Sequence, residues 1–246
     1  MKKITIEKVC ILAGKIMLVS GAETYRVEDT MNRIAAAFDV ENAQSYATPT
    51  GINFSTDMAE ATYSLRILKR STDLHKIAEV NKVSRRIAAG DFDIEEAYLA
   101  LREVDTNNAM YPAWVLILIA AIASGCFSIM FGGSFEDFLP AFFAGGLGFM
   151  AMLGFERLVE IRFLSEFFGA FIVGIASIIF IQIGFGKALD MVIIGAVMPL
   201  VPGLHITNAV RDLMAGHLVS GVSKGVEALL TAFAIGAGVA VTFAFI

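Results

Sequence analysis

The sequence predicts an α-helical integral membrane protein in which about five transmembrane helices follow a cytoplasmic, mainly helical α+β domain. Hydrophobic residues make up 57% of the 246 positions, charged residues only 17%, and the mean hydropathy is +0.70. An average soluble domain is about 45–50% apolar and about 25% charged. The charges are also unevenly placed: residues 1–112 carry 14 Lys or Arg and 16 Asp or Glu, which is 30 of the 43 charged side chains. The rest of the chain contains long charge-free stretches, as a membrane domain would.

The same composition excludes two other classes of protein. Disordered chains combine low hydrophobicity with high net charge, which is the opposite of this sequence. A nucleic-acid-binding protein needs a basic face, whereas the formal net charge here is −5. Cys10 and Cys126 are too few for a disulfide framework or a zinc site. We therefore expect a lipid bilayer, and no nucleic acid, as a partner.

The first part of the chain reads as two amphipathic helices, at residues 4–19 and 24–38, joined by a turn at residues 20–23. A small strand pair or meander is expected at about residues 43–68, because apolar and polar residues alternate there as they do in half-buried strands. The alternating apolar residues are Ile52, Phe54, Ala61, Tyr63, Leu65 and Ile67.

Two further helices are expected before the membrane domain. Apolar residues recur at helical spacing from Leu74 to Ile87, with Asp73 as a candidate N-cap and Gly90 as a stop. Asp93 followed by Glu96 matches a capping box, which opens the next helix. These elements complete a predicted cytoplasmic domain at residues 1–112.

The membrane domain is predicted at residues 113–246, after a boundary near Pro112, because proline disfavours a helical residue before it. A spanning helix needs about 20 mostly apolar residues. Five windows without Asp, Glu, Lys or Arg come close to this length, and the second could extend through Glu136 or Glu156. They are Ala113–Phe135, Phe138–Phe155, Phe167–Gly186, Met191–Val210 and Ala228–Ile246.

The loops between these windows predict the orientation. The second and fourth loops carry two basic residues each, whereas the first carries none and the third only Lys187. Basic loops face the cytoplasm, so the N-terminal domain is expected in the cytoplasm and the C-terminus outside. Glu7, Lys8 and Lys15 interrupt the apolar stretch after Met1, unlike a secretory signal. These residues also favour an N-terminal domain that stays in the cytoplasm.

Pro199 and the pair Pro202-Gly203 interrupt the fourth window. Proline removes a helical hydrogen bond, and broken membrane helices occur where they line a cavity. In many transporters the break lies at the substrate site. The alternatives are a simple proline kink or an early helix end.

Polar residues follow this break directly. His205, Thr207 and Asn208 lie at the inner end of the window, and Arg211 and Asp212 follow one turn later. Two interpretations stay open: an inner gate or polar lining, and a water-exposed cluster at a helix end. Ionisable groups within a membrane are functional hypotheses by default.

Glu227 opens the last window and would lie about two turns inside a helix that starts near Ser220. A carboxylate at that depth must be paired, hydrated or protonated, and Arg211 is a candidate partner. Glu227 could act in proton coupling or serve as an interfacial anchor.

Two segments of the chain resemble the threonine/serine exporter family. The first is Gly21-Ala22-Glu23-Thr24-Tyr25-Arg26-Val27-Glu28-Asp29-Thr30. The second runs from Pro202-Gly203 to Asn208 and continues through Arg211-Asp212, Gly216, Ser220-Gly221 and Glu227-Ala228. The order of a cytoplasmic domain and about five spans also matches, so the resemblance covers nearly the whole chain.

The resemblance implies secondary active export of small metabolites, threonine and serine or dicarboxylates such as succinate, across the inner or plasma membrane and driven by the proton gradient. Full-length members fuse this unit to a second, smaller membrane unit. The present sequence therefore resembles the larger component of a split exporter, and a separate smaller subunit is expected as its partner. A homo-oligomer is the alternative way to complete the pathway.

The resemblance also implies a cytoplasmic motif made of Gly21, Glu23, Tyr25, Arg26 and Glu28. Arg26 can pair with Glu23 at i, i+3 on a helix. The motif is then either a solvated, salt-bridged turn or a regulatory or gating surface against the inner loops.

Two other classes of function are alternatives to an exporter. A membrane-anchored enzyme would place its chemistry in residues 1–112, where polar clusters occur at residues 23–29 and 53–57. No nucleophile–base pair or metal-ligand spacing is evident, so no catalytic residue, metal or cofactor is expected. A purely structural protein is the third class, and it would not need polar residues beside a broken helix.

Overall fold

The computed structural model describes residues 4–107, 111–159 and 161–245. Contacts divide the chain into two compact units. We call residues 1–109 together with 204–225 the N-terminal unit, and residues 110–203 together with 226–246 the apolar unit. The sequence analysis assigned residues 113–246 to a single membrane domain. By its contacts, the segment 204–225 instead groups with the first part of the chain.

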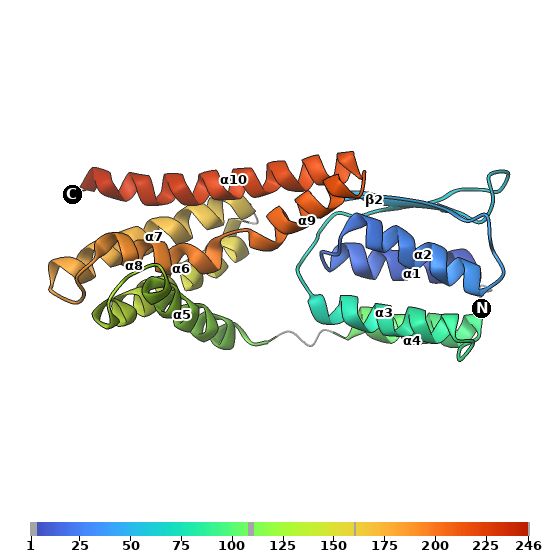
Figure 1. Cartoon of the computed structure of the whole chain (residues 1–246), viewed down its shortest axis with the longest axis horizontal. Coiled ribbons are helices and arrows are strands. Elements are labelled where there is room, and N and C mark those ends of the chain that lie inside the picture. The colour runs from blue at the N-terminus through green and yellow to red at the C-terminus, as the bar shows by residue number, and fades with distance from the viewer. Residues whose placement is uncertain (1–3, 108–110, 160, 246) are drawn as a thin grey trace. The chain divides into compact units, whose positions relative to one another are not determined.

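Four helices form most of the N-terminal unit (Figure 1): α1 (Ile6–Val19), α2 (Thr24–Ala37), α3 (Leu74–Ala88) and α4 (Ile94–Thr106). All four were predicted, with ends that differ by two residues or fewer at the positions where bounds were given. The expected caps are present. The Asp73 carboxylate accepts a hydrogen bond from the Lys76 N–H at 3.0 Å, and Asp93 and Glu96 form a complete capping box. Local side-chain chemistry therefore sets where these helices begin.

The predicted meander is a three-stranded antiparallel sheet in the order β1-β2-β3. Its strands are β1 (Gln44–Thr48), β2 (Gly51–Ser55) and β3 (Tyr63–Arg66). Ile52 and Phe54 point to the buried face of β2, as the alternating pattern predicted. The sheet packs through β2 against α1 and through β1 against α2.

Helix α1 lies at the centre of the core of the N-terminal unit. It contacts α2, α3, α4 and the sheet, and Val9, Ala13, Ile16 and Met17 are 2% exposed or less. Full burial of one large aliphatic side chain stabilises the fold by about 1.5–3 kcal/mol. Cys10 belongs to the same core, and burial raises the pKa of its thiol to about 12, so this thiol stays protonated.

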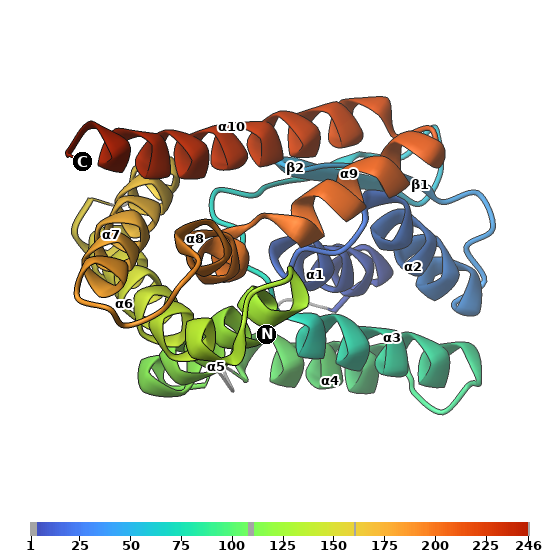
Figure 2. The ribbon, with the colours of Figure 1, turned by 60° about the vertical axis from the view of Figure 1, so that its left-hand side comes forward.

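The apolar unit contains α5 (Ala113–Met130), α6 (Phe135–Val159), α7 (Arg162–Gln182), α8 (Leu189–Val197), the short 3-10 helix η1 (Met198–Leu200) and most of α10 (Leu218–Thr242). Figure 2 shows α8 lying among α5, α6 and α7, which it contacts. A final 3-10 turn, η2, covers Phe243–Phe245.

Within the described part of the chain, α5, α6, α7 and α10 are each long and apolar enough to cross a membrane. The count rises to five if α8 and α9 (Gly203–Met214) form one broken span. The predicted number of about five is consistent with this range. Helix α6 does extend through Glu136 and Glu156, which the sequence had left open.

The interruption of the fourth window is confirmed. Helix α8 gives way to η1, which contains Pro199, and α9 starts only after Val201 and Pro202. The fifth charge-free window opens at Ala228 because Glu227 precedes it, whereas α10 begins at Leu218, close to the helix start near Ser220 that the sequence predicted. Lys224 and Glu227 both lie within this continuous helix.

Small residues allow the helices of the apolar unit to approach closely. A Cβ atom added to Gly195 would lie 2.6 Å from the backbone nitrogen of Ser128 and 2.7 Å from its Cα atom. One added to Gly145 would overlap the side chain of Ser124. Stripes of small residues are a common basis of helix packing in membranes, where close contact replaces the hydrophobic effect.

One buried carboxylate organises an end of the apolar unit. Asp137 is 1% exposed and accepts hydrogen bonds from the backbone N–H groups of Ser134, Lys187 and Ala188 at 2.7–3.0 Å, and from the Ser134 hydroxyl at 2.7 Å. The Lys187 ammonium pairs with Glu136 at 2.9 Å. These bonds fix the turns before α6 and before α8 against each other, because they satisfy a charge that burial would otherwise disfavour.

Candidate functional site: a buried polar network in the N-terminal unit

The N-terminal motif begins in the turn between α1 and α2. Gly21 has φ +86°, a left-handed conformation that glycine adopts without strain. The N–H of Ala22 donates to the Met17 carbonyl at 3.0 Å, which closes the end of α1. Helix α2 then starts at once, with Glu23 as its N-cap residue. As a result Ala22, Glu23 and Thr24 are all buried.

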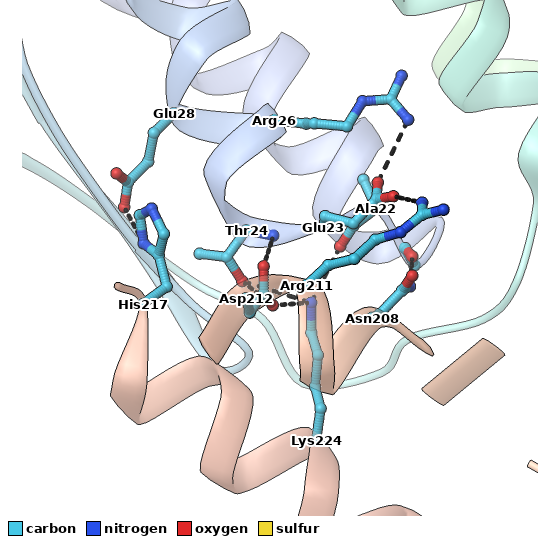
Figure 3. A network of polar contacts seen from close by, with 11 residues as sticks. Ala22, Glu23, Thr24, Arg26, Glu28, Asn208, Arg211, Asp212, His217 and Lys224 are labelled. Carbon is cyan, nitrogen blue, oxygen red and sulfur yellow. Dashed lines mark hydrogen bonds and ion pairs between the residues drawn. The ribbon is translucent and has the colours of Figure 1, made fainter. Parts of the chain in front are cut away.

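Helix α9 carries the C-terminal motif on one face. Asn208, Arg211 and Asp212 are spaced at i, i+3 and i+4, so they point in similar directions. The Asn208 side-chain amide donates to the Gly21 carbonyl oxygen at 2.9 Å. The two motifs, about 190 residues apart in sequence, therefore meet in space (Figure 3).

Asp212 lies at the centre of the network and is fully buried. Its carboxylate accepts the Thr24 N–H at 2.8 Å, the Thr24 hydroxyl at 3.0 Å and the Lys224 ammonium at 2.7 Å. The Thr24 N–H is at the start of α2, where the helix dipole also favours a negative charge. Asp212 thus has partners for both carboxylate oxygens.

Lys224, in the second turn of α10, is the cation of this pair, and its side chain is 6% exposed. Besides Asp212, its ammonium donates to the Ala22 carbonyl at 3.1 Å and contacts the Thr24 hydroxyl at 3.4 Å. A buried ion pair is tolerated only when both charges have further hydrogen bonds. Here α2, α9 and α10 each supply part of them.

Glu23 bridges two arginines. One oxygen accepts from Arg26 at 3.2 Å, which confirms the expected i, i+3 pair, and the other accepts from Arg211 at 2.5 Å. Burial alone would raise the pKa of Glu23. Its own backbone N–H, the hydrogen bond from Arg211 and the two guanidinium charges outweigh burial and hold that pKa below its usual value. Glu23 is therefore charged at neutral pH.

Glu28 has the opposite shift. Burial raises its pKa, with a contribution from the Asp212 charge, and this exceeds the opposing effects of the Ala47 N–H, which donates at 2.8 Å, and of His217. The His217 ring nitrogen Nδ1 lies 3.7 Å from the Glu28 carboxylate. The network therefore contains one carboxylate whose pKa is lowered, Glu23, and a second whose pKa is raised, Glu28.

Seven of the predicted site residues meet in this network: Gly21, Glu23, Arg26, Glu28, Asn208, Arg211 and Asp212. Tyr25 is 37% exposed on α2, and no contact of it with these residues is seen in the described chain. Pro199 and Pro202 lie at the break before α9, and Gly203, His205 and Thr207 are in its first turns. Glu227 is half-buried in the part of α10 that belongs to the apolar unit.

Arg211 forms an ion pair that the sequence analysis did not predict. Arg211 was the candidate partner of Glu227, and its guanidinium pairs with Glu23. The reason is that α9 presents Arg211 to the α1–α2 turn, where the buried Glu23 carboxylate needs a positive partner.

Sequence reasoning missed Thr24, His217 and Lys224 as members of the network. Thr24 and the residues around Lys224 lay inside the recognised motifs, and a single lysine between apolar stretches was a usable signal for a buried ion pair. Among the described residues, no group of three or more His, Cys, Asp or Glu side chains is placed to hold a metal ion.

Comparison with known proteins places these motifs in a family. The family model for threonine/serine exporters (ThrE) matches residues 8–246. The chain is 24% identical to the "Probable succinate transporter subunit YjjP" of Klebsiella aerogenes, over 96% of this chain and 93% of that protein. It is 25% identical to the "Probable threonine/serine exporter" of Mycobacterium tuberculosis, over 94% of this chain but 44% of that protein.

A third relative, the "Threonine/serine exporter" of Corynebacterium glutamicum, is 25% identical over 92% of this chain and 48% of its own length. No solved structure matches the chain. Since the family model covers nearly the whole sequence, and includes both motifs of the buried network, the chain belongs to the threonine/serine exporter family.

Proposed function

We propose that this chain is one subunit of a secondary active exporter of small metabolites, coupled to the proton gradient. Membership of the exporter family and several apolar helices support a membrane exporter. The observation that carries the proposal is the network itself. A buried ion pair and a bridged carboxylate hold the segment that follows the break at Pro202 against the α1–α2 turn of the N-terminal unit.

This geometry suits a gate. Residues 204–225 are attached at one end to the break at Val201 and Pro202, and they are held by hydrogen bonds to the α1–α2 turn. A movement of α9 would have to break charged hydrogen bonds, which gives the segment two discrete arrangements rather than a continuum. The proposed role of Asn208, Arg211 and Asp212 is therefore to couple the N-terminal unit to the state of the pathway.

For the substrate, we propose dicarboxylates such as succinate ahead of threonine and serine. The chain matches 93% of a relative named as a succinate transporter subunit, but less than half of the two relatives named as threonine/serine exporters. The word subunit in the first name supports a second, smaller membrane protein as partner. A homo-oligomer is the alternative.

The proposed orientation places the N-terminal unit in the cytoplasm and the C-terminus outside. The basic loop residues Arg211 and Lys224 belong to the same compact unit as residues 1–109. This supports one common side for them, as the positive-inside rule requires.

The test is transport by purified protein. The full chain is reconstituted in proteoliposomes, alone and together with a smaller membrane subunit of the same family, and a proton gradient is imposed. Labelled succinate should move only when both subunits and the gradient are present, and a protonophore should stop it. Movement of threonine or serine instead would replace the substrate, and movement by this chain alone would favour the homo-oligomer.

Absence of transport for all three substrates, with both proteins shown to be inserted, would contradict the proposal. It would instead favour the hypothesis that residues 1–112 form an enzyme. Within the first of the two polar clusters behind that hypothesis, Glu23 is engaged in ion pairs with Arg26 and Arg211.

A further inference from the structure

A second feature of the N-terminal unit is a cavity of about 720 Å³ beside the buried network. This volume lies within the range of about 300–1,000 Å³ that is usual for small-molecule sites. Four elements of the unit line it: the α1–α2 turn, α2, α3 and α9. Its lining includes Thr207, Asn208 and Arg211, which the sequence analysis gave as candidate gating or pathway residues.

The lining comes from two regular helix faces. On α9 it is formed by residues 204, 207, 208 and 211, and on α3 by residues 74, 77, 78, 81, 82, 85 and 86. Both series follow the i, i+3, i+4 spacing of a single helical face. Two helices thus direct one continuous stripe each toward the same space, so the site has a rigid frame rather than loops alone.

The charges on this lining are strongly unbalanced. Five basic side chains border the cavity, and Glu23 is the only acidic one. The basic residues are Arg26, Lys82, Arg85, Arg86 and Arg211. Lys82 and Arg86 also have acidic neighbours just outside, Glu79 at 3.5 Å and Asp91 at 3.6 Å. The carboxylates of Glu23, Glu79 and Asp91 balance three of the five cations, so two positive charges stay uncompensated.

Basic side chains are crowded on this face of α3. Lys82 has a like charge at i+3, Arg85, and another at i+4, Arg86, and such neighbours destabilise a helix. In the described part of the chain, Arg85 forms no ion pair, and it is exposed to the cavity side of α3. An anion in the cavity would relieve this repulsion, and arginine is the side chain best suited to hold a carboxylate with two parallel hydrogen bonds.

The cavity also has an apolar part. Leu74 and Leu204, both large and 58% and 46% exposed, belong to its wall together with Ala78. Exposed leucines contribute nothing to the binding of an inorganic anion, but they cover the hydrocarbon backbone of an organic one. The amides of Asn81 and Asn208 lie on the same lining.

We propose that this cavity is a binding site for a small organic dicarboxylate. Two uncompensated positive charges match two carboxylates, and the apolar wall matches the carbon chain between them. This inference rests on the proposed function for its choice of ligand, and it assigns a binding site to the N-terminal unit. Because Glu23 and Arg211 belong both to the cavity and to the buried network, an occupied site would act directly on the contacts of α9.

The experiment is equilibrium binding to the full chain in lipid nanodiscs, measured by titration calorimetry with succinate, threonine and inorganic phosphate. Such binding needs neither the partner subunit nor a gradient, so its failure is distinguishable from a failure of transport. The test variant is Lys82→Gln with Arg85→Gln, both at exposed positions outside the buried network. The matched control is Arg66→Gln with Arg102→Gln, which removes the same charge from exposed positions away from the cavity.

We expect saturable binding of succinate that is about tenfold weaker in the test variant, equivalent to about 1.4 kcal/mol, and unchanged in the control. Melting temperatures of both variants should equal that of the wild type, which shows that folding is intact. The proposal is overturned if succinate does not bind saturably, if both double variants weaken it equally, or if threonine or phosphate binds as tightly as succinate.

Discussion

The interactions inside the two compact units differ in kind. In the N-terminal unit, residues 204–225 are attached by a buried ion pair, a bridged carboxylate and side-chain to backbone hydrogen bonds. In the apolar unit, the helices meet through small residues such as Gly145 and Gly195. The first kind of contact depends on charge and can be broken and re-formed, whereas the second depends on shape. We infer that movement belongs to the first region and rigidity to the second.

The largest effect is expected from breaking the buried ion pair. Replacing Lys224 with Met leaves the Asp212 carboxylate buried without its cation, which costs about 3–5 kcal/mol when one partner of such a pair is removed. Thermal unfolding of the purified protein should show this loss. The double variant Lys224→Met with Asp212→Leu removes both charges and should recover a large part of it. Equal instability of the single and double variants would argue that packing, not charge, holds α9.

A somewhat smaller loss is expected from a change of shape in the apolar unit. Gly195→Val would place a Cβ 2.6 Å from the Ser128 backbone nitrogen, so α5 and α8 must separate. Overpacking of this kind costs about 1–3 kcal/mol. Gly236→Ala is the control, since an added Cβ there meets nothing within 4 Å. If both variants melt at the wild-type temperature, the close approach is not required for stability.

The two carboxylates of the network should respond to pH with opposite signs. The pKa of Glu23 is lowered on folding, so its stabilising contribution is present above its ordinary value of 4.5 and is lost as the pH falls through the folded pKa. The pKa of Glu28 is raised, so its contribution is present below 4.5 and is lost as the pH rises through its folded pKa.

Melting temperatures measured across pH 3–7 for Glu23→Gln and Glu28→Gln test this comparison. Glu23→Gln should lose less stability than the wild type when the pH is lowered. Glu28→Gln should lose less stability than the wild type when the pH is raised from acid to neutral. Parallel profiles for the two variants would contradict the opposite shifts, and Asp29→Asn, at an exposed position on the same helix, serves as the control.

The smallest effect is expected for the exposed pair of Arg33 and Asp29 on α2, whose side chains are 46% and 60% exposed. An exposed pair at i, i+4 stabilises a helix by about 0.3–0.5 kcal/mol. Arg33→Gln should therefore change the melting temperature little and leave transport unchanged. Arg211→Gln removes the arginine that pairs with the buried Glu23 carboxylate and should reduce both the melting temperature and transport. Similar effects of the two substitutions would remove the distinction between the network and an ordinary surface.

Much of the fold could be predicted because its signals are local. The capping box at Asp93 and Glu96, the alternation of Ile52 and Phe54, and the break at Pro202 each depend on residues within a few positions of one another. The pair of Arg26 with Glu23 follows from helical spacing in the same way. Membership of the family was likewise indicated by two contiguous motifs.

The rest depends on contacts between distant residues, which no local pattern contains. Asp212 and Thr24 are separated by 188 positions, and the sequence around either residue does not indicate that the other is its hydrogen-bond partner. The same holds for Lys224, because the residues around it do not reveal that Asp212 pairs with it inside a continuous helix.

The N-terminal unit is discontinuous, and this has a consequence for how the protein is made. Residues 1–109 leave the ribosome first, and their final segment, residues 204–225, follows only after α5 to α8 have been synthesised. Until then the α1–α2 turn presents the polar groups of Ala22, Glu23 and Thr24 without Lys224 and Arg211. Completion of this unit therefore requires that the intervening helices have been synthesised. Until then the open turn is accessible to chaperones and proteases.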